Sequence, residues 1–110
     1  MFQTSNKDIV FDGGVVDMAN REIRHEEGTR ARLTWFEFVV LTYLANHAGR
    51  PVSREEFLEH VWQVNPSGTT TRTVDMHIAK LRHKLKDDPA HPKLLIPIRG
   101  MGYMMLMRNN

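Results

Sequence analysis

The sequence predicts an α+β domain in which an N-terminal antiparallel sheet precedes three helices and a C-terminal β-hairpin. Three observations support this prediction. Short apolar runs alternate with turn residues up to residue 33, apolar residues recur at helical spacing over residues 35–86, and two apolar runs flank a Gly-Met-Gly turn near the C-terminus. The 110 residues fit one domain, expected over residues 8–107 after a flexible segment at residues 1–7.

The sheet is expected over residues 8–33. Its strands are DIVF, GVVDM, REIRHE and RARL, and Gly or Asn occurs in each of the three turns between them. Turns this short connect neighbouring antiparallel strands, so the segment is predicted to form a small meander.

Two capping boxes mark the starts of the first two helices. Thr34 with Glu37 opens a helix expected over residues 35–48, and Ser53 with Glu56 opens one over 54–62. Gly49 is a suitable stop for the first helix. Because so few residues join the two helices, they must cross steeply, as in a helix-turn-helix. Asn-Pro and Ser-Gly pairs then predict a loop over residues 63–71.

The third helix is expected over residues 70–86, and its core face is a narrow apolar stripe. At about 100° per residue, the stripe contains Val74, Ile78, Leu81 and Leu85. The opposite side carries Arg72, Met76, Ala79, Lys80 and His83. One flank carries Thr73, His77 and Lys84, and the other carries Asp75 and Arg82. The basic residues therefore avoid the predicted core.

A β-hairpin is expected over residues 94–107, where LLIPIR and YMMLM flank the Gly-Met-Gly turn. Pro97 cannot donate a hydrogen bond to a ladder, so its strand should lie at a sheet edge. Three helices followed by such a hairpin have the outline of a winged helix-turn-helix, with the hairpin as the wing.

Charge separates the third helix from the rest of the chain. The net charge is only +2, yet Arg72, Lys80, Arg82, Lys84 and Lys86 accompany a single acid, Asp75, in this one element. A basic helix on a nearly neutral body indicates nucleic-acid binding, and the major groove of DNA is wide enough to admit a helix. The alternative is a solvated helix with cations near its C-terminal dipole, above all Lys84 and Lys86. Asp75 is expected to orient a basic neighbour or to cap the helix start.

Other classes of function find little support in the sequence. The chain has no cysteine for a disulfide or thiolate metal site, and His77 and His83 are six residues apart, so they point in different directions around a helix. No spacing of acids, histidines and hydroxyls indicates catalysis, and no apolar run has the length of a membrane span. We therefore expect neither an enzyme, a cofactor, a metal site nor a membrane protein.

RTVDMHIAKLRHKL followed by RGMGY resembles the OmpR/PhoB-type winged-helix effector domain of bacterial two-component response regulators. LTWFEFVVLTYL, GRPVSREEFLEHVW and DDPAHP fit the pattern of that family in the same order. The resemblance covers residues 8–107. It implies a sequence-specific duplex DNA-binding domain that regulates transcription in the bacterial cytoplasm and binds direct repeats as a head-to-tail dimer. A phosphorylated receiver domain usually controls this pairing in the family, so the chain is expected to be either a C-terminal output domain cut from such a protein or a regulator that works without a receiver.

The resemblance also implies which residues meet DNA. The third helix would be the recognition helix, Arg99 would enter the minor groove, Tyr103 would lie near a phosphate, and the loop at 63–71 would reach RNA polymerase. The candidate DNA-binding residues are Trp62, Arg72, Thr73, Met76, His77, Lys80, Arg82, His83, Arg99 and Tyr103. Ala79, Pro97 and Trp35 depart from the family's usual residues, which leaves the target sequence open. The alternative function is a protein-interaction module that uses the Met-rich last strand.

Overall fold

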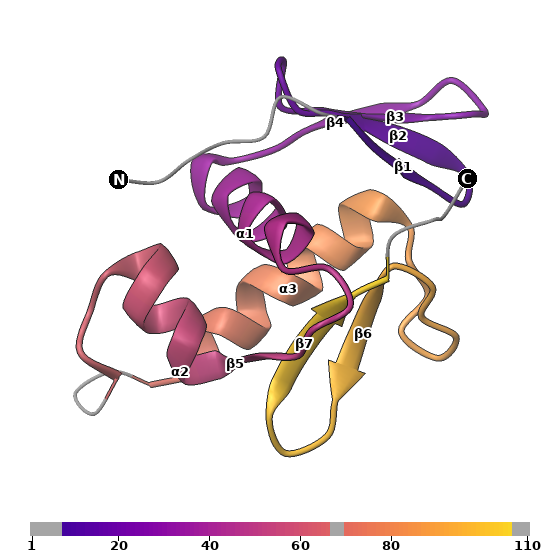
Figure 1. Ribbon diagram of the computed structural model, residues 1–110. Helices are drawn as coiled ribbons and strands as arrows, with labels where there is room; N and C mark the ends of the chain where they lie inside the picture. Colours follow the sequence, from indigo (N-terminus) through magenta and orange to yellow (C-terminus); the bar gives the residue numbers. More distant parts are fainter. Residues whose placement is uncertain (1–7, 67–69, 107–110) are drawn as a thin grey trace.

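The computed structural model describes residues 8–66 and 70–106, and it confirms the α+β winged-helix class (Figure 1). The segment expected at residues 1–7 lies outside the described residues. The order is four short strands, α1, β5, α2 with a π-helical continuation, α3, and the wing strands β6 and β7. In Figure 1, α1 lies between the N-terminal sheet and α3, and the wing hairpin extends from the opposite side of α3.

The N-terminal sheet is the expected antiparallel meander, with strand order β1-β2-β3-β4. The strands are Ile9–Phe11, Gly14–Asp17, Glu22–His25 and Arg30–Arg32. Val16 in β2 is the register partner of both Ile9 and Ile23, and all three side chains are buried. The sheet is attached to the end of α3 by His25, whose Nε2 lies 2.9 Å from the carbonyl oxygen of Lys84.

Helix α1, Trp35–Asn46, begins with the predicted capping box in full. The hydroxyl of Thr34 accepts the Glu37 N–H at 3.3 Å, and the Glu37 carboxylate accepts the Thr34 N–H at 2.8 Å. The helix ends two residues before the expected position 48, because the N–H of His47 turns tightly onto the carbonyl of Leu44. Gly49 follows with φ +83° and donates its N–H to the carbonyl of Met105 in the last strand.

The second helix occupies residues 54–62 as expected, but only its first part is α-helical. Helix α2, Arg54–Phe57, continues as a π-helix, η1, over Leu58–Trp62 and ends at Gln63 with φ +58°. The predicted capping box at its start is only half formed. Ser53 Oγ accepts the Glu56 N–H at 3.0 Å, whereas the Glu56 carboxylate does not return to the Ser53 N–H.

Glu56 instead accepts hydrogen bonds from Tyr43 and Arg50. Its Oε2 lies 2.5 Å from the Tyr43 hydroxyl and 2.7 Å from Arg50 Nη2. The hydrogen bond from Arg50 is the main reason why the pKa of Glu56 falls to about 2, and burial with the Glu56 contact raises the pKa of Tyr43 to about 12. This group joins α1 and the turn after it to α2.

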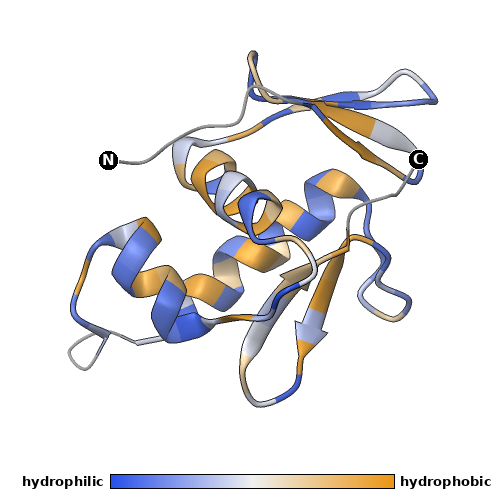
Figure 2. Cartoon of the chain, in the orientation of Figure 1, coloured by the Kyte–Doolittle hydropathy of each residue, from blue (hydrophilic) through white to orange (hydrophobic). Residues whose placement is uncertain are grey.

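Helix α3, Arg72–Leu85, has the predicted core stripe. Val74, Ile78, Leu81 and Leu85 are all buried. They pack in one core with apolar residues of α1, α2 and both sheets. Figure 2 shows the corresponding apolar segments in α1, in α3 and in the strands that border them.

The second sheet has strand order β5-β7-β6, with β5 at Val52–Ser53, β6 at Leu95–Ile98 and β7 at Gly102–Met105. Pro97 lies in an edge strand as predicted, because β6 pairs only with β7 among the described strands. Strand β5, which joins the connector between α1 and α2 to the wing, was not predicted from the sequence. At Gly102 a Cβ would lie 2.0 Å from the carbonyl oxygen of Val52, so the close pairing of β5 with β7 requires glycine there.

Candidate nucleic-acid interface

One side of α3 is free of packing and carries four of the candidate residues. Arg72, Met76, Lys80 and His83 are exposed, and Met76 retains 53% of its accessible surface. Ala79 lies on the same side and is also exposed. This surface is the one that the helical projection of the sequence predicts. It is therefore the candidate surface for a groove of DNA.

The cations on this surface are not neutralised by neighbours. No Asp or Glu oxygen of the described residues lies within 4.0 Å of the side-chain nitrogens of Arg72, Lys80 or Arg99. Most of the other described arginines and lysines form ion pairs, and the exceptions are Arg21 and Arg32 in the N-terminal sheet. The unpaired positive charge outside that sheet therefore gathers on α3 and the wing.

Arg99 begins the turn between the two wing strands and is exposed. Gly100 follows with φ +74°, and the Met101 N–H closes the turn on the carbonyl of Ile98 at 3.0 Å. A side chain with positive φ at position 100 would strain this tight turn. The turn thus holds one arginine at the tip of a narrow hairpin that projects from the body of the domain (Figure 1).

Trp62 and His77 belong to an aromatic cluster beside the N-terminal part of α3. The Trp62 ring stacks on Phe36 with centroids 5.3 Å apart, and the His77 ring meets Trp62 edge-on at 5.0 Å. His77 Nδ1 lies 2.9 Å from the carbonyl oxygen of Thr73. Since a carbonyl only accepts, Nδ1 carries the proton in that bond. The cluster leaves Trp62 half-buried and Phe36 37% exposed.

Two candidate residues are turned away from this surface. The side chain of Arg82 is only 13% exposed, and its Nη2 donates to the carbonyl of Leu95 in β6 at 2.5 Å. Tyr103 is 7% exposed, and its hydroxyl donates to Asp75 Oδ1 at 2.6 Å. Burial, together with this bond, raises the pKa of Tyr103. The structure therefore groups these two with the wing strands and not with the exposed cations.

Lys84 and Lys86, left open between phosphate binding and the helix dipole, are both held by the protein. Lys84 Nζ lies 2.6 Å from a carboxylate oxygen of Glu37 and 2.9 Å from the carbonyl oxygen of Arg32. Lys86 pairs with Glu27 of the N-terminal sheet. The Lys84 ammonium thus neutralises a carboxylate that is only 2% exposed, which favours a structural role for this lysine.

Arg54 is a residue of this region that sequence reasoning missed. Its Nε donates to Asp75 Oδ1 at 2.7 Å, and its guanidinium lies 5.3 Å from the centroid of the Tyr103 ring. The bond to Asp75 raises the pKa of Arg54. Asp75 therefore orients a basic neighbour as expected, but that neighbour comes from α2. The only sequence signal was the position of Arg54 next to a helix cap.

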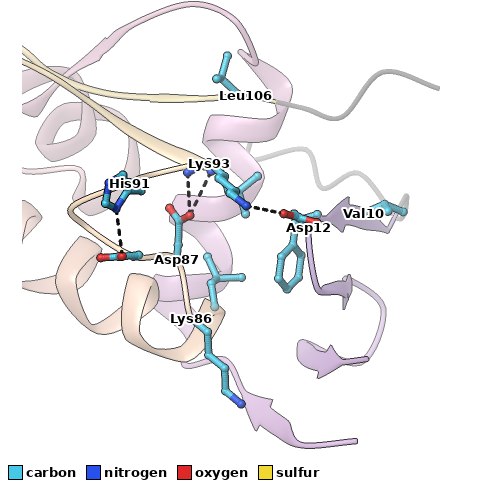
Figure 3. Close-up of a pocket in the computed structure, with 11 residues that line it drawn as sticks. Val10, Asp12, Lys86, Asp87, His91, Lys93 and Leu106 are labelled. Atoms are coloured by element: carbon cyan, nitrogen blue, oxygen red, sulfur yellow. Dashed lines mark hydrogen bonds and ion pairs between the residues drawn. The ribbon is translucent and has the colours of Figure 1, made fainter. Parts of the chain in front are cut away.

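A hollow of about 540 Å³ lies at the C-terminal end of α3, between β1 and the segment that leads to β6 (Figure 3). The charged side chains around it have partners within the protein. Lys93 pairs with Asp12 at 2.8 Å, His91 lies 3.5 Å from Asp88, and Asp87 accepts the backbone N–H groups of residues 93–95. This hollow thus lacks the free charges that the α3 surface has.

The described residues hold no group of three or more His, Cys, Asp or Glu side chains that could bind a metal ion. No helix within residues 8–66 and 70–106 is long and apolar enough to cross a membrane.

Residues 28–105 match the family described as "Transcriptional regulatory protein, C terminal". The chain belongs to this family. The match includes α1, α2, α3 and the wing, together with the exposed cations described above. The resemblance to OmpR/PhoB-type effector domains, drawn from the sequence, is thereby confirmed.

Solved structures and curated relatives agree with this assignment. The DNA-binding domain of RstA from Klebsiella pneumoniae, solved in complex with the RstA box, is 32% identical over 91% of this chain and 97% of that one, with a TM-score of 0.75. The response regulator DrrB, described as an OmpR/PhoB homologue of Thermotoga maritima, is 32% identical over 90% of this chain and 44% of its own, with a TM-score of 0.74.

Among curated proteins, the probable transcriptional regulator ycf27 of Galdieria sulphuraria is 41% identical over 101 residues, which is 91% of this chain and 40% of that protein. The chain therefore spans about two fifths of the length of the curated relatives that it matches.

Proposed function

We propose that this domain binds duplex DNA in a sequence-specific manner, as part of a transcriptional regulator. The observation that carries the proposal is the gathering of unpaired cations, Arg72, Lys80 and Arg99, on α3 and the wing tip. A protein surface that leaves its charges unneutralised beside a groove-sized helix is suited to a polyanion. The relative RstA, whose structure contains its DNA box, supports the same interpretation.

In this proposal α3 enters the major groove and reads base edges. Lys80 is placed to donate to a guanine, and the methyl groups of Thr73 and Met76 are placed to contact a thymine methyl. Arg72, His77 and His83 reach phosphates around them, and Trp62 packs against the backbone from the end of η1. Phosphate contacts supply most of the affinity, and the base contacts supply the choice of sequence.

The wing reaches the adjacent minor groove through Arg99. An arginine at a narrow hairpin tip fits the A·T-rich minor groove, where the negative potential is strongest. Ala79 lies on the exposed side of α3 without a polar group, so this position adds at most a methyl contact. The surface thus combines direct readout by α3 with shape readout by the wing.

The wider role follows from the family. We propose that the domain is the C-terminal output part of a response regulator, that a phosphorylated receiver controls it, and that two copies bind direct repeats head to tail. Contact with RNA polymerase through residues 63–71 belongs to the same proposal, and residues 67–69 of that loop lie outside the described part of the chain. The bacterial cytoplasmic location stays a prediction.

The salt dependence of binding tests the DNA proposal. With about five phosphate contacts, log K should fall with log salt at a slope near −4.5, so binding to a random duplex should weaken roughly five-hundredfold between 50 and 200 mM salt. Arg72→Ala combined with Lys80→Ala should lower the magnitude of this slope by about 1, because Arg72 is assigned to a phosphate and Lys80 to a base edge. The matched control, Arg21→Ala with Arg32→Ala, removes the same charge from the N-terminal sheet and should leave the slope unchanged.

The rival function, a protein-interaction module, loses part of its basis in the structure. Met105 is fully buried and Met104 is half-buried, so these residues of the last strand do not present a methionine surface. Absence of binding to any duplex at low salt, or an equal effect of both double variants on the slope, would favour the rival over the DNA proposal.

A further inference from the structure

Two side chains on one flank of α3 hold the two strands of the wing. Asp75 accepts the hydroxyl of Tyr103 in β7 at 2.6 Å, and Arg82 donates to the carbonyl of Leu95 in β6 at 2.5 Å. Positions 75 and 82 are seven residues apart, which is nearly two full turns of an α-helix, so they face the same direction. The wing is thereby attached to α3 at two points along its length.

The Arg82 attachment is shielded from water, whereas the Asp75 side chain is 43% exposed and its attachment is reinforced by a second donor. Arg82 is 13% exposed and its Nε lies 3.9 Å from Asp87, whose carboxylate accepts backbone N–H groups just before and within β6. At the other point, Arg54 shares the same Asp75 oxygen at 2.7 Å and covers the Tyr103 ring. Charged hydrogen bonds screened from water hold their geometry better than surface pairs do.

We propose that Asp75, Arg82 and Tyr103 are positioning residues that fix the angle of the wing against α3, and that the contribution of Arg99 to DNA binding depends on them. This inference rests on the proposed function, and it gives Arg82 and Tyr103 a role other than direct contact with DNA. The wing tip can reach the minor groove only if the hairpin leaves α3 at one angle, because α3 itself is fixed in the neighbouring groove.

The β5–β7 pairing does not fix this angle alone. It joins only two residue pairs, Val52 with Tyr103 and Ser53 with Gly102, and it leaves β6 without a ladder partner on its outer edge among the described strands. Backbone bonds from Gly49 to Met105 and from Arg54 to Met101 also hold β7 and the turn before it, but they do not reach β6. The two bonds from one flank of α3 hold both wing strands and so oppose rotation of the hairpin. Lys80 lies on α3 itself, so its position does not depend on the wing.

A double-mutant cycle on a duplex selected from a random pool by the unaltered protein tests the inference. The double variant, Tyr103→Phe with Arg82→Met, removes both attachments but keeps the aromatic ring and the apolar stem. In the unaltered background, Arg99→Ala should weaken binding about ten- to a hundredfold. In the background of the double variant the same change should weaken binding less than about twofold, whereas Lys80→Ala should cost the same in both backgrounds.

The outcomes separate the two proposals. The positioning role is overturned if Arg99→Ala weakens DNA binding in the folded double variant as much as in the unaltered protein. It is also overturned if, in the unaltered protein, Lys80→Ala weakens binding and Arg99→Ala does not. In both cases the DNA proposal stands. If the unaltered protein shows no salt-dependent DNA binding, the proposed function itself fails. Should circular dichroism show the double variant unfolded, Tyr103→Phe alone removes one hydroxyl from the fold. It should reduce the effect of Arg99→Ala at least threefold, and an undiminished effect refutes the inference.

Discussion

Replacing Lys84 with methionine separates a role in the core from a role at DNA. The Lys84 ammonium lies 2.6 Å from Glu37, which is almost fully buried and also closes the capping box of α1. Methionine keeps an unbranched apolar stem of similar length but removes the charge. We therefore expect a lower free energy of unfolding and no change in the affinity of the folded domain for DNA.

The size of the loss follows from the burial of the two groups. Removing one partner of a buried ion pair costs about 3–5 kcal/mol, because the other charge stays buried without compensation. The loss should be smaller here, because the Lys84 side chain is 28% exposed and Glu37 still accepts the hydrogen bond from the Thr34 N–H. We therefore expect the free energy of unfolding to fall by about 2–3 kcal/mol. Lys86→Met is the matched control. It breaks a pair whose two side chains are both 54% exposed, and it should leave the free energy of unfolding almost unchanged.

The loss should depend on pH in a defined direction. Burial raises the pKa of Glu37, but the bonds from Lys84 and Thr34 outweigh it and lower the pKa overall. A carboxyl with a lowered pKa in the folded state adds stability above its unfolded pKa, and this stability is lost as pH falls through the folded pKa. Without Lys84 burial dominates and Glu37 takes up a proton more easily. The difference between Lys84→Met and the unaltered protein should therefore shrink below about pH 5.

Urea unfolding followed by tryptophan fluorescence at pH 7 and at pH 4 measures the stability, and fluorescence anisotropy with a labelled duplex measures the affinity. Glu37→Gln combined with Lys84→Met should recover most of the loss, since no charge then stays buried. A structural role for Lys84 is refuted if Lys84→Met unfolds at the same urea concentration as the unaltered protein yet binds every duplex several-fold more weakly. That result would indicate that Lys84 contacts DNA phosphates.

Two other predictions concern the recognition surface and the acid stability of the fold. Lys80→Ala should cost about 1–3 kcal/mol of binding free energy and relax the choice of one base pair. Selection of bound duplexes from a random pool should then show one degenerate position. An equal loss of affinity for all duplexes would contradict base reading by Lys80. Glu56 has a pKa lowered from 4.5 to about 2, chiefly by Arg50, which corresponds to about 3 kcal/mol. Because Arg50 is 49% exposed, we expect about 2 kcal/mol of stability that is present above about pH 5 and lost as pH falls toward 2. Glu56→Gln should flatten that acid decline in urea midpoints, and an unchanged decline would assign it to other carboxyl groups.

Local features of this fold could be predicted from the sequence. The capping box of Thr34 and Glu37, the four buried residues of the α3 stripe and the edge position of Pro97 depend on spacing within one element or on the chemistry of one residue. The same projection correctly placed Arg72 and Lys80 on the exposed side of α3. In these cases the neighbours that decide the outcome lie within a few positions along the chain.

Features that depend on distant partners could not be predicted. Helical spacing placed Lys84 on a flank, but it could not show that Glu37, 47 positions away, lies opposite. It placed Asp75 and Arg82 together on the other flank without showing that the wing strands pack there. The two-residue strand β5 has no pattern of its own and exists only through its ladder to β7. The π-helical geometry of η1 likewise corresponds to no recognisable motif in the sequence.

The ladder between β5 and β7 has a consequence for protein engineering. A fragment that stops before residue 95 would lose Leu95, Tyr103 and Met105 from the core and would expose Val52, which is now fully buried. The three helices alone are therefore not expected to keep their fold when they are moved to another protein. New target specificity must be introduced by exchanging side chains on the outer side of α3 within the intact domain, where the scaffold that orients them is retained.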